Sequence, residues 1–191
     1  IKMGNSHNVE LSNVNVGGGH PNYGYGYISI ADRSSNIHVH DSRLTILNDQ
    51  PFGHGVAGYQ VQAGGCSQSH VPRICTSVGT LGDGMVIENN EIHGRISISS
   101  IDIPPFTIND NTFTKTYSWD CGIYISAGSS STNQWGDGGH MITDNSFSCM
   151  RSIDIIGNNG NIISGNTFED GDVGIQLRAS QNNEIFENNF I

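Results

Sequence analysis

The chain has 191 residues, which is the size of one domain, and its formal charge of −10 comes from 8 lysines and arginines against 18 aspartates and glutamates. Two lysines in the whole chain leave no basic patch for nucleic acid. No apolar run reaches the length of a membrane span, and residues 1–20 lack the pattern of a signal peptide. The composition argues against a nucleic-acid partner and against membrane insertion, and it favours a neutral or mildly acidic ligand.

A six-residue motif recurs from near the beginning of the chain to its end. It reads apolar, polar, turn-former, small polar residue, spacer, apolar, as in ISGNTF from Ile163. The fourth positions of successive copies are Val14, Ser42, Asn90, Asn111, Asn145, Asn166 and Asn188, with steps of 28, 48, 21, 34, 21 and 22 residues. The bare unit is therefore about 21 or 22 residues. A unit this short cannot bury its own apolar face, so it must stack on its neighbours as a solenoid.

Short alternating apolar runs with Gly, Asn and Asp between them predict strands, because no segment shows the 3.6-residue spacing of a helix. A second alternating segment follows each copy, as in GRISIS from Gly94. The fold class is therefore all-β, a single-stranded parallel β-helix of about six to seven coils. Loop insertions are expected at residues 17–25, 48–57, 64–84, 114–121 and 127–139.

Two internal columns of stacked side chains are expected inside the coils. One contains Ile28, Val61, Ile96, Ile123, Ile153 and Ile175, and the other contains Leu11, Val39, Ile87, Ile108, Ile142, Ile163 and Ile185. The recurring Asn is expected at a corner between strands. There its amide bonds backbone groups of its own or adjacent coils, and it tolerates left-handed φ.

This organisation resembles the right-handed parallel β-helix superfamily of pectate lyases, periplasmic copper-site maturation proteins, polysaccharide epimerases and phage tailspikes. The resemblance rests on the copies quoted above, such as INDNTF and ITDNSF, and covers nearly the whole chain. The character is closest to tailspikes and other polysaccharide-processing members. It implies a right-handed helix and, for a tailspike, a side-by-side homotrimer, whereas the reaction has to be argued from a site.

Residues 1–191 are expected to form one β-helix domain. Neither end shows the polar or helical cap that a solenoid requires, so the sequence predicts a fragment of a longer chain. Two disulfides are the first hypothesis for the cysteines, Cys66 with Cys75 inside one insertion and Cys121 with Cys149 across adjacent coils. Buried free thiols are the alternative. The absence of a CxxC spacing argues against a zinc site.

Candidate ligand-binding residues appear in chain order from the first insertion onward. Tyr23 and Tyr25 lie in a Gly-rich loop, and aromatic rings on a loop suit stacking against sugars. His38 and His40 alternate with the inward Ile37 and Val39, so both histidines share an outer face. With Asp41 beside them they could bind metal or move protons, although exposed histidines are usually inert.

The two longest insertions leave the coil at the same place and are expected to stand as walls around a groove over the third coil. Extended polymers suit such a groove on the side of a solenoid. The floor is expected to include Gln60, Arg95, Ser97, Tyr124, Asp102 and Asp154. The second wall contributes Trp135 and His140, and an enlarged corner of the fourth coil adds Trp119 as a further ligand-binding candidate.

Each wall ends in a Gly-Asp-Gly turn, which contains Asp83 in the first and Asp137 in the second. Their carboxylates are candidates for the acid and base of an inverting glycosidase, where the two groups stand about 6.5–9.5 Å apart. An ordinary turn explains the same pattern. A lyase would instead use Arg95 and Tyr124, with His93, to remove a proton beside a uronate carboxylate.

The sequence as a whole predicts an extracellular protein, secreted or on a virion surface, that binds and cleaves a polysaccharide. A glycoside hydrolase is preferred to a lyase, and Asp102 joins Asp83, Asp137, Arg95 and Tyr124 as a catalytic candidate. No cofactor is predicted, and a divalent cation is left open. A non-catalytic β-helical stalk or adhesin segment is the alternative function.

Overall fold

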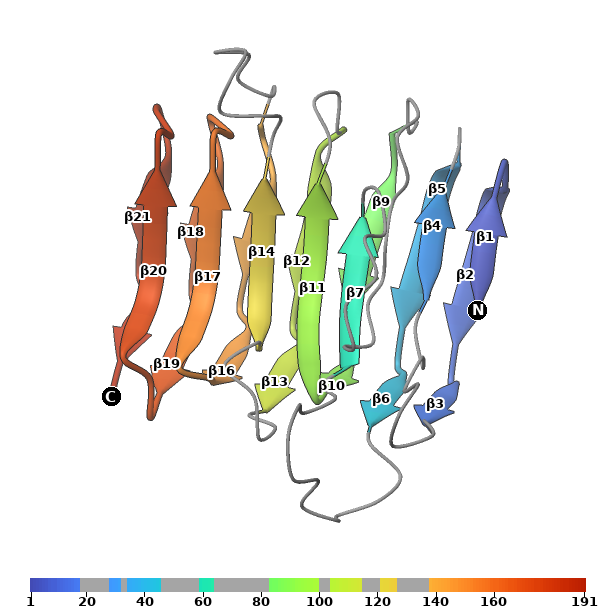
Figure 1. The fold of residues 1–191 in the computed structure, drawn as a ribbon, viewed down its shortest axis with the longest axis horizontal. Helices are drawn as coiled ribbons and strands as arrows, with labels where there is room; N and C mark the ends of the chain where they lie inside the picture. The colour runs from blue at the N-terminus through green and yellow to red at the C-terminus, as the bar shows by residue number, and fades with distance from the viewer. Residues whose placement is uncertain are drawn as a thin grey trace, which may run out of the picture.

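The computed structural model describes residues 1–17, 28–31, 34–45, 59–63, 83–99, 104–114, 121–126 and 138–191. These residues form three parallel sheets of seven strands each, and the chain visits the sheets in turn, once per coil. Figure 1 shows the first sheet in front, the second behind it and the short strands of the third at the lower edge. The protein is a parallel β-helix of seven coils, as the repeats predict.

The three sheets are named A, B and C in the order in which each coil visits them. Sheet A consists of β1 (Lys2–Gly4), β4 (Ser29–Ala31), β7 (Tyr59–Ala63), β11 (Gly94–Ser99), β14 (Gly122–Ser126), β17 (Arg151–Ile156) and β20 (Val173–Arg178). Sheet B consists of β2 (His7–Ser12), β5 (Ser35–His40), β9 (Met85–Glu88), β12 (Phe106–Asn109), β15 (Met141–Thr143), β18 (Ile162–Ser164) and β21 (Glu184–Phe186). Sheet C consists of β3 (Asn15–Gly17), β6 (Arg43–Thr45), β10 (Glu91–Ile92), β13 (Thr112–Thr114), β16 (Ser146–Ser148), β19 (Thr167–Glu169) and β22 (Asn189–Phe190).

The strand register confirms the predicted column of sheet B from Leu11 to Ile185 and the predicted column of sheet A from Val61 to Ile175. In sheet B the pairs run without a break from Leu11 with Val39 to Ile163 with Ile185. In sheet A, Val61 pairs with Ile96 and the column continues to Ile175. Sheet C adds a third column, in which the rings of Phe113, Phe147, Phe168 and Phe190 stack with centroids 4.8, 5.2 and 4.8 Å apart.

The recurring asparagines form a hydrogen-bonded ladder inside the corner between sheets B and C. Asn145 is typical, because its Nδ2 donates to the carbonyl oxygens of Ile108 and Thr143 at 2.9 Å and to Oδ1 of Asn166 at 3.0 Å. Its own Oδ1 accepts from the backbone N–H and the Nδ2 of Asn111 at 3.0 Å. Each side chain thus joins its own coil to both neighbours, as the sequence predicts.

The expectation of left-handed φ at these asparagines is wrong. The left-handed residue is the preceding one, with φ of 52° at Asn89, 51° at Asp110 and 56° at Asp144. This residue makes the sharp turn, and Asn and Asp tolerate that conformation better than other residues. The ladder asparagine follows with ordinary backbone angles, so its amide points into the stack.

The expected insertions 17–25, 48–57, 64–84, 114–121 and 127–139 lie largely outside the described residues. The strands that flank them still locate their exits. Residues 64–84 and 127–139 both fall between a strand of sheet A and a strand of sheet B, because they follow β7 and β14. The strand that lies between β7 and β14 in sheet A is β11, which the sequence assigns to the floor of the groove.

Candidate functional site

The outer face of sheet A carries a line of polar and aromatic side chains on consecutive coils. Register pairs Ser97 with Tyr124, Tyr124 with Asp154, and Asp154 with Gln176. These residues alternate with buried isoleucines, and alternate side chains of a strand point to opposite faces. Neighbouring strands are about 4.8 Å apart, so the line from β11 to β20 spans about 14 Å.

Two arginines flank this line at opposite ends. The guanidinium carbon of Arg95 lies 4.1 Å from the centroid of the Tyr124 ring, which is a cation–π contact. At the other end, Arg178 donates to both carboxylate oxygens of Asp154, from Nη2 at 2.6 Å and from Nε at 3.3 Å. The Asp154 side chain is only 13% exposed, whereas that of Arg178 is 47% exposed. The outer face of sheet A therefore presents an aromatic ring between two fixed cations.

Two of the predicted ligand-binding residues do not have accessible side chains. Ser97 has the outward register but is only 4% exposed. His140 was expected on the wall of the groove, yet its side chain is completely buried at the corner between sheets A and B. Its Nδ1 accepts a hydrogen bond from the backbone N–H of Phe106 at 3.0 Å. His140 therefore has a structural environment, and burial lowers the pKa of its imidazole to about 4.

The other predicted site residues are only partly placed. Asp83 is exposed at the corner between sheets A and B, where its carbonyl oxygen accepts from the backbone N–H of Asn36 at 2.9 Å. Gln60 pairs with Arg95 in register, so it lies in the same sheet. The remaining candidates lie outside the described residues, so the proposed Asp83–Asp137 pair stays a prediction. The candidates outside the described residues are Tyr23, Tyr25, Cys66, Cys75, Asp102, Trp119, Trp135 and Asp137.

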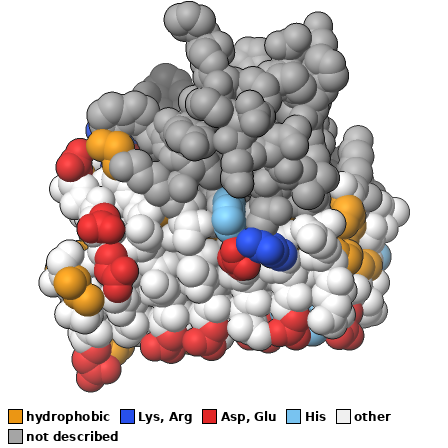
Figure 2. All heavy atoms as spheres, turned by 90° about the horizontal axis from the view of Figure 1, so that it is seen from below, with side chains coloured by type: hydrophobic (Ala, Val, Ile, Leu, Met, Phe, Trp, Pro, Cys, Tyr) orange, Lys and Arg blue, Asp and Glu red, His pale blue; other side chains and the backbone are white. Residues whose placement is uncertain are grey.

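Charge is distributed unevenly between the faces. Among the described arginines, Arg95, Arg151 and Arg178 belong to sheet A and Arg43 belongs to sheet C. The corner between sheets B and C is acidic, and Figure 2 shows a row of acidic side chains along one edge of the molecule. A hollow of about 610 Å³ lies at this corner, and its lining comprises Glu88, Asn89, Asp110, Asn111, Thr112, Asp144 and Ser146. Three of the four described arginines therefore lie in sheet A, whereas acidic side chains line the corner between sheets B and C.

A second cluster lies on the outer face of sheet B, where the sequence predicts His38 and His40 side by side. Their ring centroids are 4.1 Å apart with an angle of 30° between the planes. Nε2 of His38 is 2.7 Å from Oε1 of Glu88 on the next coil. Nε2 of His40 is 3.0 Å from Oε1 of Glu10 on the preceding coil, and Nδ1 of His40 is 2.7 Å from Oδ2 of Asp41. We call these five residues the histidine–carboxylate cluster.

Hydrogen bonds within the histidine–carboxylate cluster shift the pKa values of His40 and Asp41. The bond to Asp41, and then the bond to Glu10, raise the pKa of His40 above its ordinary value. The bond from His40 lowers the pKa of Asp41, and Asn89 contributes through a hydrogen bond from its Nδ2. A similar but simpler arrangement occurs on sheet C, where Glu91 accepts from Nε2 of His93 at 2.6 Å and from Nε of Arg43 at 3.0 Å. That site has one imidazole, whereas the cluster has two.

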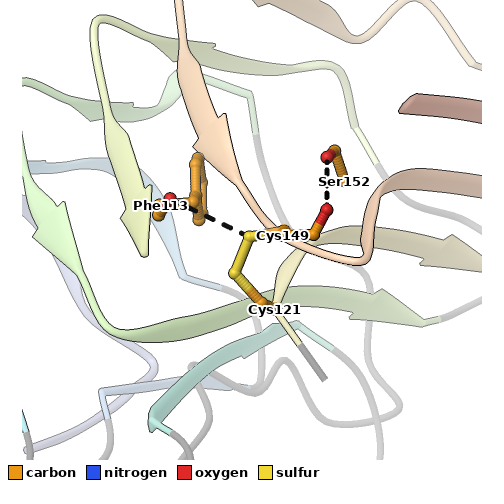
Figure 3. Close-up of a disulfide and its surroundings, with 4 residues drawn as sticks. All are labelled: Phe113, Cys121, Cys149 and Ser152. Atoms are coloured by element: carbon orange, nitrogen blue, oxygen red, sulfur yellow. Dashed lines mark hydrogen bonds between the residues drawn. A yellow bond between two sulfur atoms is a disulfide. The ribbon is translucent and has the colours of Figure 1, made fainter. Parts of the chain in front are cut away.

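The predicted disulfide between Cys121 and Cys149 is confirmed. The two residues have a Cα–Cα separation of 5.5 Å and are 28 positions apart. Figure 3 shows the bridge beside Phe113, whose carbonyl oxygen is 3.9 Å from the sulfur of Cys149, and beside Ser152. Cys121 precedes β14 and Cys149 follows β16, so the bridge closes one complete coil. Stable disulfides form in oxidising compartments outside the cytoplasm.

The fold and the disulfide define a class of protein, a parallel β-helix stabilised for an oxidising compartment. A family model described as "Periplasmic copper-binding protein (NosD)" matches residues 77–191, which is more than half of the chain. The chain belongs to this NosD family. No curated protein and no solved structure matches it. The family match does not include a pectate lyase or tailspike family. The description of the NosD family places that family in the periplasm.

The family description implies copper, and most of the described cysteine and histidine side chains in the matched segment are already bonded. Both of its described cysteines are consumed by the disulfide, and His140 is buried with Nδ1 already bonded. His93 is bonded to Glu91. Among the described residues, no three His, Cys, Asp or Glu side chains are arranged to hold a metal ion. The described His, Cys, Asp and Glu side chains of the matched segment therefore form no group that is arranged to hold copper.

Some partners in these sites were not anticipated from the sequence. Glu10 and Glu88 bond the two histidines, and Arg178 bonds Asp154. The repeat alignment contains the signal for the glutamates, because Glu10 and Glu88 occupy the columns of His38 and His40 on adjacent coils. The bonds themselves run diagonally between neighbouring strands, from His38 to Glu88, from His40 to Glu10 and from Arg178 to Asp154, so they depend on side-chain conformation as well as on alignment.

Proposed function

We propose that this protein is a periplasmic β-helix that binds a polysaccharide along the outer face of sheet A. The observation that carries the proposal is the contiguous set in which Tyr124 and Asp154 are register partners, Arg95 lies over the Tyr124 ring and Arg178 bonds Asp154. Aromatic rings stack against the apolar faces of sugars, and paired arginine and carboxylate groups bond hydroxyl and carboxylate groups. The rigid stack holds these groups about 4.8 Å apart, which suits an extended ligand.

The charge distribution supports a neutral or mildly acidic glycan. Sheet A carries three of the described arginines, whereas the corner between sheets B and C carries the acidic row. The formal charge of −10 weakens the attraction for a strongly anionic polymer. The proposed function is binding. Cleavage by Asp83 with Asp137 would be an additional activity, and the experiment below distinguishes binding alone from binding followed by cleavage.

Binding is tested by titrating the full chain with neutral and uronate-containing cell-surface glycans in a calorimeter. We expect Tyr124→Ala to weaken binding at least tenfold, because stacking is lost. Tyr124→Phe keeps the ring, so it should bind nearly as well as the parent chain. Thr107→Ala, on the outer face of sheet B, is the matched control and should leave affinity unchanged. Equal affinity in the parent chain and Tyr124→Ala would refute the proposal.

Cleavage is followed in the same samples by new reducing ends and by absorbance at 235 nm. Reducing ends alone indicate hydrolysis, and both signals together indicate a lyase, which forms an unsaturated product. Binding without either signal assigns a binding protein without catalysis. Absence of both binding and cleavage with every glycan would favour the stalk function expected as the alternative.

A further inference from the structure

We propose that the histidine–carboxylate cluster is a pH-dependent link that fastens the first three coils to one another. Its members come from three neighbouring strands of sheet B, with Glu10 on β2, His38 and His40 on β5, and Glu88 on β9. Asp41 follows β5 directly, at the corner towards sheet C. The cluster lies on a different sheet from the proposed glycan site, so this inference does not depend on the proposed function.

Hydrogen bonds through His40 run without a break from the first coil to the third. Nε2 of His40 is 3.0 Å from Oε1 of Glu10, and Nδ1 is 2.7 Å from Oδ2 of Asp41. The other carboxylate oxygen of Asp41 accepts from Nδ2 of Asn89 on the third coil. The side chains therefore add to the backbone pairing of β2, β5 and β9 at one end of sheet B.

The contacts of His40 require a positively charged ring. An ionised carboxylate has no proton to give, so it only accepts hydrogen bonds. Both ring nitrogens of His40 face a carboxylate, and both must therefore carry a proton. A neutral ring has one N–H and can keep only one of the two bonds. In agreement with this geometry, the bonds to Asp41 and Glu10 raise the pKa of His40 above its ordinary value.

Loss of the proton should release Glu10 rather than Asp41. Asp41 is the next residue in the chain after His40 and is also held by Asn89. The side chain of Glu10 is 67% exposed, so water readily replaces its bond to the ring. A neutral His40 then keeps its bond to Asp41 and no longer joins the second coil to the first.

The second imidazole limits the cluster to one such step. The ring centroids of His38 and His40 are 4.1 Å apart, where two positive charges would repel each other. His38 needs no positive charge, because a neutral ring can donate from Nε2 to Oε1 of Glu88 at 2.7 Å. The titratable groups that face His40 are Glu10 from β2, His38 from β5, Asp41 after β5 and Glu88 from β9. One imidazolium among three carboxylates is the charge state that this arrangement favours.

The link should be closed in mildly acidic solution and open in alkaline solution. Because the pKa of His40 is raised in the folded chain, its stabilising contribution is complete below the pKa of an unfolded histidine, about 6.5. The contribution is lost as the pH rises through the raised pKa of the folded chain. Among the described strands of sheet B, β2 pairs with β5 alone, so opening should loosen β2 first.

The test measures amide hydrogen exchange of the full chain between about pH 6 and about pH 9, with each rate divided by that of an unstructured peptide at the same pH. We expect the protection of β2 to fall about two- to fivefold over this range, because one exposed ion pair is lost. Protection of β18 should stay constant. Glu10→Gln should remove the pH dependence in β2, since an amide can accept from a charged ring and donate to a neutral one.

Glu184→Gln is the matched control. Glu184 occupies the same outer column of sheet B as Glu10, but its register partner is Ile162 rather than a histidine. This variant should keep the pH dependence of β2. A nuclear magnetic resonance titration of His40 gives a second measurement, and its midpoint should move to lower pH in Glu10→Gln and further in Asp41→Asn.

Three results would overturn the proposal. The first is constant protection of β2 across the pH range in the parent chain. The second is the same pH dependence of β2 in Glu10→Gln as in the parent chain, or an equal loss of protection in β18. The third is a His40 midpoint that does not move in either variant. The His40 titration is read from the folded protein at every pH, so it tests the link even where the change in exchange is small.

Discussion

The backbone N–H of His140 donates to Oδ1 of Asn161 at 3.2 Å, and the imidazole of His140 accepts from Phe106 one coil earlier. Asn161 has the same relation to the next coil, where its N–H donates to Oδ1 of Asn183 at 3.0 Å. The corner between sheets A and B therefore contains its own ladder of side-chain acceptors. His140 takes the place of an asparagine in this ladder. Accepting at Nδ1 requires a neutral ring with its proton on Nε2, and this buried Nε2 has no hydrogen-bond partner among the residues that the structure describes.

Acid should destabilise the protein through His140. Burial lowers the pKa of His140 from 6.5 to about 4, so the unfolded chain takes up a proton at higher pH than the folded chain. The free energy of unfolding is not reduced by His140 above pH 6.5, and it falls as the pH decreases towards 4. The loss over that interval is about 3 kcal/mol. Urea unfolding at pH 7, 6, 5 and 4.5 measures it.

His140→Asn isolates this contribution, because the asparagine restores the side chain found at Asn161 and does not titrate. We expect the variant to fold and its stability to fall less steeply between pH 6.5 and 4.5. The same slope in variant and parent chain would assign the acid sensitivity to other groups, such as the carboxylates.

Asn145 should contribute more to stability than a surface residue of the same coil. Asn145→Ala removes three donated bonds and leaves the N–H of Asn111 without its acceptor. An unsatisfied buried polar group costs about 1–3 kcal/mol, so we expect a loss of about 3 kcal/mol or more. Thr143→Ala changes a half-buried side chain on the same coil and should cost less than about 1 kcal/mol. Chemical denaturation compares the two, and similar losses would contradict a special role for the ladder.

Removal of the Cys121–Cys149 bridge should lower stability by about 3.6 kcal/mol. Closing a segment of 28 residues restricts the unfolded chain, and the entropy model gives a value of this size. Cys121→Ala with Cys149→Ala, compared with the parent chain in thermal unfolding, measures the effect. Dithiothreitol should lower the melting temperature of the parent chain further than that of the double variant. An unchanged melting temperature in the variant would show that stacking alone fixes this coil.

The stacked phenylalanines of sheet C should differ in importance by position. Phe147 is fully buried between Phe113 and Phe168, with ring planes 6° apart on both sides. Phe147→Ala should therefore cost about 3–5 kcal/mol. Phe190 is 60% exposed, so Phe190→Ala should cost less than half as much. Equal losses measured by urea unfolding would contradict this ranking.

The sequence repeats predict the fold more completely than the sites, because every coil has the same spacing between its strands. The contacts within a site depend in addition on the conformations of individual side chains. Ile87, Ile108 and Ile142 are found in register because each copy uses the same backbone path. The left-handed residue was misplaced by one position, since Asn tolerates that conformation in either place. The two glycines before His140 suggest a loop, whereas the ladder that buries His140 becomes visible only when the coils are superposed.

A covalent ring inside a solenoid also changes how the molecule responds to force. Pulling on the two ends can peel away the coils on either side of β14, β15 and β16, but the ring formed by Cys121 and Cys149 cannot be drawn out. The chain between the cysteines would otherwise extend by about 100 Å, which is 28 residues at about 3.6 Å each. A stretching experiment should recover that hidden length only after reduction, so the bridge acts as a mechanical stop between the four coils before it and the two coils after it.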